Sequence, residues 1–282
     1  MKKAIVTGAD GLLGRRVVAA LRAADYDVTG VDLDTLDITD FAAVRRMFAD
    51  IAPDIAINCA AWTDVDGCAR DPERALRVNG YGAQNVAVAS ALVSSAVVQI
   101  SSNEVFDGQQ TAPYREYDDT RAANPYGYSK LTAERGVVAV NPRHFIVRTA
   151  WLFDENGRNF IHAILNAAQS GKPLRVVTDE VATPTYNVDL ATALVALVDS
   201  GRYGVYHLTN GGACSRYDFA RHVLDCAGWH DTPITPITLA DWPRDSTPPP
   251  HAVLANTSAA AIGITLRDWQ SAVADFVRQH AP

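Results

Sequence analysis

The sequence predicts an α/β fold, in which a doubly wound parallel sheet carries a smaller, partly discontinuous C-terminal lobe. Two observations lead to this prediction. Short runs rich in β-branched residues alternate with longer helical patterns over residues 1–150, which is typical of parallel strands joined by crossover helices. Beyond residue 150 the alternation becomes irregular and proline-rich sequence appears, which indicates a second structural unit.

The first lobe is expected to alternate strands and helices. Each expected strand is an apolar run bounded by turn residues, as in a sheet that is covered on both faces. The strands are expected at residues 3–7, 27–32, 54–58, 96–101 and 144–148. The helices between them are expected at residues 12–24, 41–51, 72–93 and 125–140. Right-handed crossovers then produce the doubly wound order.

The rest of the chain has a different rhythm. Its expected elements are a helix at 159–169, a strand at 174–177, a helix at 190–198, a strand at 205–208 and an amphipathic helix at 266–280. Six of the 14 prolines lie between residues 233 and 250, so this segment is predicted to be a long ordered loop. We expect residues 1–152 and 187–209 to form one lobe, and residues 153–186 and 210–282 to form the other.

Composition and charge restrict the classes of partner. The 282 residues carry a net charge of −7, and they lack the basic cluster that nucleic acid requires, so nucleic acid is not expected as a partner. No apolar run is long enough to cross a membrane. The four cysteines match neither a zinc pattern nor a redox pair. The sequence therefore predicts a cytoplasmic chain with free thiols, no membrane association and no metal.

A glycine-rich loop, GADGLLG, follows the first expected strand and opens the first helix. Glycines let the backbone approach a pyrophosphate closely, and the free N–H groups of the helix N-terminus attract the anion. The place of the loop between a strand and a helix predicts a Rossmann-type dinucleotide site. The loop residues expected to contact the dinucleotide are Gly8, Gly11, Leu12, Leu13 and Gly14.

Asp32 ends the second expected strand, where a carboxylate can bind the adenosine ribose hydroxyls of a dinucleotide. The same negative charge repels the 2′-phosphate of NADPH, although Arg15 and Arg16 lie nearby in the sequence. We therefore expect NADH or NADPH as cofactor, with NADH favoured. The alternative is that Asp32 is a solvated residue at a strand end.

A Tyr-x-x-x-Lys pair, Tyr126 and Lys130, lies on one face of the fourth expected helix, which Asn124 caps. A phenol has a pKa of about 10, and a nearby ammonium can lower it. Ser102 lies at the carboxyl end of the fourth strand, where it can polarise a substrate oxygen. We therefore expect Ser102, Tyr126 and Lys130 to be catalytic. The alternative is a surface helix on which Lys130 pairs with Glu134.

These motifs together resemble the extended short-chain dehydrogenase/reductase superfamily and, within it, the dTDP-4-dehydrorhamnose reductase family. The similarity extends over nearly the whole chain. The matching segments are DITD at 37–40, NCAAWTDVD at 58–66, VN at 78–79, SSNEVFDG at 101–108, YGYSK at 126–130 and RTAWLF at 148–153. The resemblance implies NAD(P)H-dependent reduction of the 4-keto group of a dTDP-linked 6-deoxy-4-ketohexose. A nucleotide sugar is thus the expected small-molecule partner.

The resemblance also assigns roles to individual residues. Besides the glycine loop and the acid after the second strand, it assigns cofactor binding to Asp37, Ile38, Ala60, Ala61, Thr63, Asn79, Ser101, Tyr126 and Lys130. It assigns substrate binding to Ser102, Asn103, Glu104 and Trp151. Three alternatives stay open: Asp37 can cap the next helix, Asn79 can be a buried polar group, and Trp151 can belong to the core.

Two segments depart from the family pattern. Ser102-Asn103-Glu104 stands where the family commonly has Thr-Asp-Tyr, and Pro248-Pro249 stands where an Arg-Pro pair is expected. Both lie in the implied sugar pocket, so the identity of the 4-ketosugar stays open. The alternatives are a reductase or epimerase of another nucleotide sugar and a reductase-like regulatory subunit without turnover. A homodimer is an open alternative to a monomer.

Overall fold

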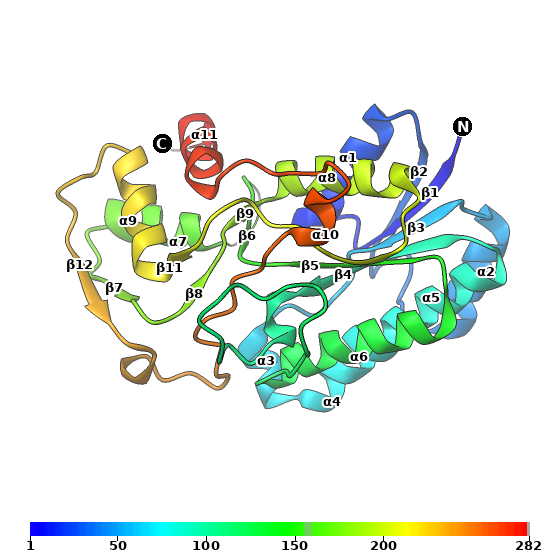
Figure 1. Cartoon of the computed structure of the whole chain (residues 1–282), viewed down its shortest axis with the longest axis horizontal. Helices are drawn as coiled ribbons and strands as arrows, with labels where there is room; N and C mark the ends of the chain where they lie inside the picture. Colours follow the sequence, from blue (N-terminus) through cyan, green and yellow to red (C-terminus); the bar gives the residue numbers. More distant parts are fainter. Residues whose placement is uncertain (156, 158, 281–282) are drawn as a thin grey trace.

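A six-stranded parallel sheet forms the centre of the N-terminal lobe in the computed structural model, which describes residues 1–155, 157 and 159–280 (Figure 1). The strands are β1 (Lys3–Thr7), β2 (Asp27–Val31), β3 (Ile55–Asn58), β4 (Ala96–Ser102), β5 (His144–Thr149) and β10 (Gly204–His207). Their spatial order is β2-β1-β3-β4-β5-β10. Successive strands are added on one side of β1 up to β2 and on the other side from β3 onward, and such a switch in strand order opens a ligand crevice at the carboxyl ends of the strands. The expected α/β fold class is confirmed.

Helices cover both faces of this sheet. The helices α1 (Leu12–Ala23) and α8 (Asn187–Ser200) pack on one face, and α2 (Phe41–Ile51), α5 (Gly82–Leu92) and α6 (Pro125–Val140) pack on the other (Figure 1). Successive strand side chains alternate between the two cores, because Val6 packs with α1 and α8 whereas Ile5 packs with α2 and α5. Both sets are buried, so the strands are apolar throughout.

The helix expected at 72–93 is not continuous. The chain first forms α3 (Val65–Arg70) and α4 (Pro72–Ala75), then a six-residue π-helix, η1 (Leu76–Tyr81), and only then α5. A π-turn adds a residue per turn, and such turns often lie at functional sites. Apolar periodicity predicts a helix here but does not reveal this change in winding.

The C-terminal lobe is built around aromatic side chains. The helices α7 (Phe160–Gln169), α9 (Arg216–Cys226) and α11 (Trp269–His280) enclose Phe153, Phe219 and Phe276. The helix α9 is absent from the sequence-based prediction, and α11 begins three residues later than expected. Small strand pairs complete the lobe: β6 (Leu152–Phe153) with β9 (Thr185–Tyr186), and β8 (Val181–Ala182) with β11 (Cys214–Ser215).

The proline-rich segment 233–250 is not only a loop, so that prediction is wrong in part. It contains β12 (Ile234–Ile237), which pairs with β7 (Leu174–Val177), and a short 3₁₀ helix, η3 (Leu239–Asp241). Pro236 is tolerated because this sheet has only two strands and its outer edge needs no N–H donor. The segment then crosses to the N-terminal lobe, where Asp66 accepts hydrogen bonds from Arg244 Nε at 2.9 Å and Ser246 N at 3.0 Å.

The short helices η2 (Asn103–Val105) and α10 (Thr257–Ala260) lie beside the ends of β4 and β10. The segment 187–209 returns the chain from the C-terminal lobe to the sheet, because β10 pairs with β5. Within the described residues, no helix is both long and apolar enough to cross a membrane.

Candidate active site

The glycine loop packs more tightly than any larger residue would permit. Gly8 has a φ of +67°, and a Cβ there would lie 2.6 Å from Ala60 N. A Cβ on Gly14 would overlap the carbonyl oxygen of Gly8, because α1 folds back directly onto the loop. The loop therefore brings the N-terminus of α1 to the end of β1 and leaves its first backbone N–H groups free for an anion.

Two adjacent hollows, of about 430 and 620 Å³, extend from this loop along the carboxyl edge of the sheet and share Gly8, Gly11, Cys59 and Ala61. The first hollow contains the expected catalytic residues. Its other expected residues are Leu12, Leu13, Gly14, Thr63, Ser101, Asn103, Glu104 and Trp151. The second hollow is lined by Asp32, Asp37, Ile38 and Ala60. We call the two together the cofactor cleft.

Asp32 holds the glycine loop to the end of β2. Its Oδ2 accepts a hydrogen bond from Asp10 N at 2.9 Å, and its Oδ1 accepts one from Leu33 N at 2.8 Å. A carboxylate has about four lone-pair positions, so two remain available for ribose hydroxyls. Asp37 likewise has a local role, because its Oδ1 accepts from Thr39 N at 2.8 Å.

Asn79 does not line the cofactor cleft. It lies in the π-helix, is 1% exposed, and makes its hydrogen bonds within the protein. Its Oδ1 accepts from Trp62 N at 2.7 Å, while its Nδ2 donates to Trp62 O at 3.0 Å and to Ser129 Oγ at 2.9 Å. The structure thus supports the alternative of a buried polar group, which ties the Trp62 loop to α6.

Two arginines over the adenosine end of the cleft escape the sequence-based prediction. Arg74 and Arg77 line this end, and the Arg74 guanidinium lies 4.4 Å from the centre of the Trp62 ring. They come from α4 and η1, and their place depends on the π-helix. The dinucleotide-binding motif ends well before these residues in the sequence, so it does not predict that they line the cleft.

The N-terminus of α6 places Tyr126 beside Ser102. Asn124 caps the helix, with Oδ1 accepting from Gly127 N at 2.8 Å, and Pro125 occupies the first turn. A Cβ on Gly127 would overlap the carbonyl oxygen of Glu104, so only glycine lets the helix approach η2 this closely. Ser102 Oγ in turn accepts a hydrogen bond from Glu104 N at 3.2 Å.

The residues after Ser102 are held by the C-terminal part of the chain. Asn103 is buried, and its Nδ2 donates to Ala252 O at 3.2 Å. Glu104 Oε2 accepts from Asn124 Nδ2 at 2.6 Å, and the same Nδ2 donates to Thr247 O. Burial raises the pKa of the Glu104 carboxyl, which the bond from Asn124 opposes. Both residues line the first hollow, and the amide of Asn103 in addition supports the loop.

The electrostatics of Tyr126 differ from the expectation. Burial raises the pKa of its phenol well above 10, the nearby Glu104 carboxylate raises it further, and only Ser102 acts in the opposite direction. The expected lowering by Lys130 is not found in this structure. A phenol with a raised pKa stays protonated at neutral pH, so Tyr126 is prepared to donate a proton.

Lys130 is buried without a direct partner. Its side chain is 3% exposed, and its ammonium forms no hydrogen bond or ion pair with any described residue. Burial lowers its pKa to about 8, against the opposing charge of Glu134. The surface pair of Lys130 with Glu134, the alternative considered from the sequence, does not form, because Glu134 is bonded to Arg148 instead. A buried ammonium without a partner has donors available for a bound ligand.

Trp151 closes the cleft on the side of the C-terminal lobe. Its φ is +44°, a left-handed backbone conformation that is uncommon for a bulky residue. Proteins keep such strained residues mainly at functional sites. Its ring stacks on Phe219, and the Arg216 guanidinium lies 3.6 Å from its centre. Trp151 is half-buried and lines the cleft, so it belongs both to the aromatic cluster and to the site.

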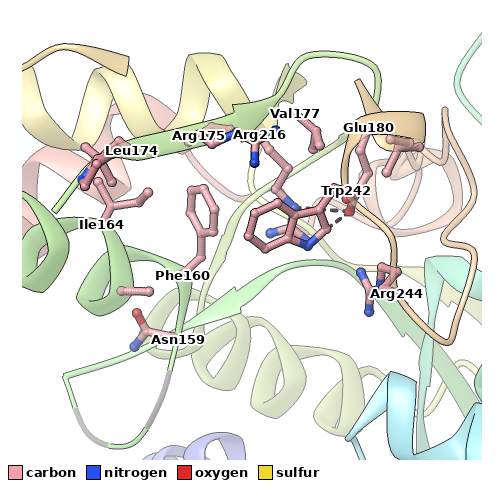
Figure 2. Close-up of a pocket in the computed structure, with 14 residues that line it drawn as sticks. Asn159, Phe160, Ile164, Leu174, Arg175, Val177, Glu180, Arg216, Trp242 and Arg244 are labelled. Carbon is pink, nitrogen blue, oxygen red and sulfur yellow. Dashed lines mark hydrogen bonds and ion pairs between the residues drawn. The ribbon is translucent and has the colours of Figure 1, made fainter. Parts of the chain in front are cut away.

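A further cavity of about 630 Å³ is lined by Arg216, whose guanidinium also contacts the Trp151 ring (Figure 2). Figure 2 shows the rings of Phe160 and Trp242 and the guanidinium groups of Arg216 and Arg244 around it. Glu180 holds Arg216: its Oε1 accepts hydrogen bonds from Arg216 Nε at 3.1 Å and from Arg216 Nη2 at 3.0 Å. We call this the arginine cavity. Its residues come from segments far apart in the sequence, so no local pattern predicts it.

Comparison with known proteins supports the resemblance. A family model described as the RmlD substrate binding domain matches residues 1–281. The chain belongs to this family. A dTDP-4-dehydrorhamnose reductase of Mycolicibacterium smegmatis is 37% identical over 280 residues, which cover 98% of this chain and 85% of that protein. The resemblance expected from the sequence is confirmed.

Solved structures of proteins named dTDP-4-dehydrorhamnose reductase have the same fold. A dTDP-4-dehydrorhamnose reductase from Clostridium acetobutylicum is 36% identical, with a TM-score of 0.94 over 98% of this chain and 99% of that one. The enzyme of that name from Bacillus anthracis, solved in complex with NADP, is 32% identical, with a TM-score of 0.95 over 99% of this chain and 100% of that one. The similarity therefore includes both lobes of this RmlD-family chain.

Proposed function

We propose that this chain reduces the C4 keto group of a nucleotide-linked 6-deoxy-4-ketohexose with NAD(P)H, with dTDP-4-dehydro-L-rhamnose as substrate and dTDP-L-rhamnose as product. The observation that carries the proposal is the meeting of Ser102, Tyr126 and Lys130 in the hollow that the glycine loop opens. Relatives that match nearly the whole chain are named for this activity, and one was solved with NADP.

The cofactor cleft fits a dinucleotide. Its glycines exclude side chains where a pyrophosphate would lie, and the free ammonium of Lys130 can donate to ribose hydroxyls of the nicotinamide half. When bound, NAD(P)H supplies the hydride that adds to C4 of the sugar. Asp32 and the small side chains of Ala60 and Ala61 then accommodate the adenosine half.

The residues of the chain supply the proton and hold the substrate. Ser102 Oγ donates a hydrogen bond to the C4 carbonyl oxygen, which polarises the C=O bond. As the hydride forms the new C–H bond, Tyr126 Oη donates its proton to the same oxygen, so the ketone becomes a secondary alcohol. Because burial keeps the phenol protonated, the proton is present before the transfer. Ser102, the group that opposes the rise in the Tyr126 pKa, stabilises the tyrosinate that remains until a proton from solvent restores the phenol.

The nucleotide of the substrate fits the arginine cavity. Phe160 and Trp242 offer rings against which a base can stack, and Arg216 and Arg244 offer guanidinium groups for a diphosphate. Arg216 touches Trp151, which lines the cofactor cleft, so the two cavities meet at this pair. A sugar joined to the diphosphate then reaches Tyr126 past the Trp151 ring.

Two alternatives lead to different measurements. A reductase or epimerase of another nucleotide sugar would use the same Ser102, Tyr126 and Lys130, and an epimerase would consume no net NADH. A reductase-like regulatory subunit would bind the cofactor without turnover. The intact catalytic set favours an enzyme, and Glu104 in place of the family's usual aromatic residue leaves the choice of sugar open.

An absorbance assay of NADH and NADPH oxidation tests the proposed function, with dTDP-4-dehydrorhamnose generated in the same vessel. We expect oxidation that depends on the sugar, with one equivalent of dTDP-L-rhamnose formed for each cofactor oxidised. Oxidation with a different 4-ketosugar only would support the other-sugar alternative. Cofactor binding without oxidation of any 4-ketosugar nucleotide would contradict a reductase.

NADH is the cofactor we propose as preferred, because Asp32 places a negative charge where NADPH carries its 2′-phosphate. Replacing Asp32 by Ala is expected to raise the ratio of kcat/KM for NADPH to that for NADH by about tenfold, equivalent to 1.4 kcal/mol. The variant should bind both cofactors less tightly, because the glycine loop loses its bond from Asp10 N.

Asp32→Asn serves as the matched control, because it removes the charge and keeps an oxygen for Asp10 N. Steady-state kinetics with both cofactors should show the same change of ratio with less loss of affinity. An unchanged ratio in both variants would contradict the proposed role of the Asp32 charge.

The remaining sequence-based expectations stay proposals. The division into lobes at 1–152 plus 187–209 and 153–186 plus 210–282 is supported by a separate apolar core made of the second set of residues, although Ala259 of that set packs in the core of the first lobe. Exposed Tyr81 and Tyr128 offer an apolar surface for a homodimer, which sedimentation of the purified chain tests. A cytoplasmic location, which free cysteines suggest, is tested by cell fractionation.

A further inference from the structure

Glu134 joins three elements of the N-terminal lobe beneath the cofactor cleft. It lies on α6, two helical turns after Tyr126 and one after Lys130, so the three side chains share one face of the helix. Its Oε1 accepts hydrogen bonds from Ser101 Oγ at 2.5 Å and from Arg148 Nε at 2.9 Å. Its Oε2 accepts a hydrogen bond from Arg148 Nη2 at 2.7 Å. Ser101 belongs to β4 and Arg148 to β5.

This contact is fully buried and closely defined. Glu134, Arg148 and Ser101 are 5%, 4% and 3% exposed. Ser101 and Arg148 are paired in register across β4 and β5, one residue before Ser102. The third guanidinium nitrogen of Arg148 is also occupied, because Nη1 donates a hydrogen bond to Glu116 O and contacts His207 Nε2. A two-bonded guanidinium–carboxylate pair has little freedom to rotate, so it fixes α6 against β5. The bond from Ser101 ties the same carboxylate to β4.

The charge of the same carboxylate also acts on Lys130. The ionisable groups that act on it are Glu134 from α6, Cys59 after β3 and Cys68 from α3. The pKa of each cysteine thiol is raised by burial, so both thiols are neutral at physiological pH. Glu134 is thus the negative charge that opposes the desolvation of the Lys130 ammonium, although the two side chains form no ion pair.

We propose that Glu134 is a positioning residue for the reduction: held by Arg148 and Ser101, it fixes Ser102 on β4 against Tyr126 on α6 and provides the counter-charge of Lys130. Glu134 does not line the cofactor cleft, so it acts only through these neighbours. The effect on catalysis rests on the proposed function, whereas the effect on the Lys130 charge does not.

Glu134→Gln tests this role, because it keeps the size of the side chain and removes its charge. We expect kcat to fall by about 10²-fold, as small misplacements of catalytic groups do, with KM for the sugar nucleotide nearly unchanged. Without the opposing carboxylate, the pKa of Lys130 falls further below its value of about 8. The Lys130 ammonium then deprotonates at a lower pH, so the pH at which kcat declines on the alkaline side falls by about one unit.

NADH affinity, measured by cofactor fluorescence over the same pH range, provides a readout without turnover. We expect its alkaline decline to move down with that of kcat in Glu134→Gln. Glu134→Asp restores the charge at a shorter reach, so it should return the decline to the wild-type pH while kcat stays low. If the wild-type chain binds NADH but reduces no 4-ketosugar, the proposed function fails and this binding measurement still tests the counter-charge.

Asp189→Asn is the control for the loss of an ion pair, here a half-buried one outside the cleft. Asp189 accepts from Arg267 Nε and Asn210 Nδ2, both at 2.8 Å, and lies outside both hollows of the cleft. We expect it to lower the thermal midpoint without moving the pH dependence. If Glu134→Gln does not fold, Ser101→Ala is the second test, because it removes the hydrogen bond from Ser101 Oγ to Glu134 and keeps the carboxylate. In this variant kcat should fall while the pH of its alkaline decline stays unchanged. A wild-type pH dependence in folded Glu134→Gln, or a wild-type kcat in Ser101→Ala, would overturn the proposal.

Discussion

Replacing Tyr126 by Phe is expected to lower kcat for the reduction by about 10²–10⁴-fold, the usual contribution of a positioned general acid. The variant loses only the hydroxyl that donates the proton, while its ring still fills the cleft wall beside Ser102. Burial and Glu104 raise the pKa of this phenol, so the hydroxyl is protonated before transfer. Steady-state rates of NAD(P)H oxidation measure the effect.

The affinity of the Tyr126→Phe variant for NAD(P)H separates catalysis from binding. We expect the dissociation constant to change little, since Lys130 and the glycine loop remain in place. Tyr128→Phe is a matched control, because Tyr128 lies on the same helix and is 56% exposed. It should retain wild-type kcat. Full turnover by Tyr126→Phe would refute Tyr126 as the proton donor.

Gly14→Ala is expected to have the largest effect on cofactor binding. The added Cβ would overlap the carbonyl oxygen of Gly8, so α1 must move away from the loop that it closes. Overpacking of this kind costs about 1–3 kcal/mol of stability. Because displacement of the helix N-terminus also removes donors for the pyrophosphate, the dissociation constant for NAD(P)H should rise by at least about tenfold.

Gly11→Ala provides a graded comparison within the same loop. Its Cβ would lie 3.1 Å from Gly8 O, a tight contact that a small shift relieves. The thermal midpoint and the NAD(P)H dissociation constant of the two variants should therefore be ordered, with Gly14→Ala the more affected. Equal behaviour would show that the approach of α1 to Gly8 is not what forms the loop.

The residues that local pattern identified are those whose role depends on short stretches of chain. The glycine loop, the strand ends at Asp32 and Ser102, and the Tyr126–Lys130 pair each combine a residue type with a place at a strand or helix terminus. Parallel strands bring their carboxyl ends to one edge, so these separate motifs were expected at one site, and the structure places them in one cleft.

Local pattern was misleading where winding or pairing depends on distant partners. The apolar period from 72 to 93 indicates a helix, yet the π-turn that buries Asn79 and carries Arg77 forms against α6 and the Trp62 loop. Pro236 argues for a loop, yet β12 needs only β7 as a neighbour. The arginine cavity combines α7, β7, α9 and the proline-rich segment, and no one of these segments indicates it.

The sequence was sufficient for the fold class, the cofactor loop and the identity of the catalytic side chains, because each is encoded by neighbours within a few residues. The charge states of those side chains required the folded chain. The pKa of Tyr126 rises rather than falls because burial desolvates the phenol and η2 brings Glu104 close to it. Lys130 is left without an ion-pair partner, because Glu134 is paired with Arg148. Burial and long-range pairing set both results, and neither can be derived from spacing along the chain.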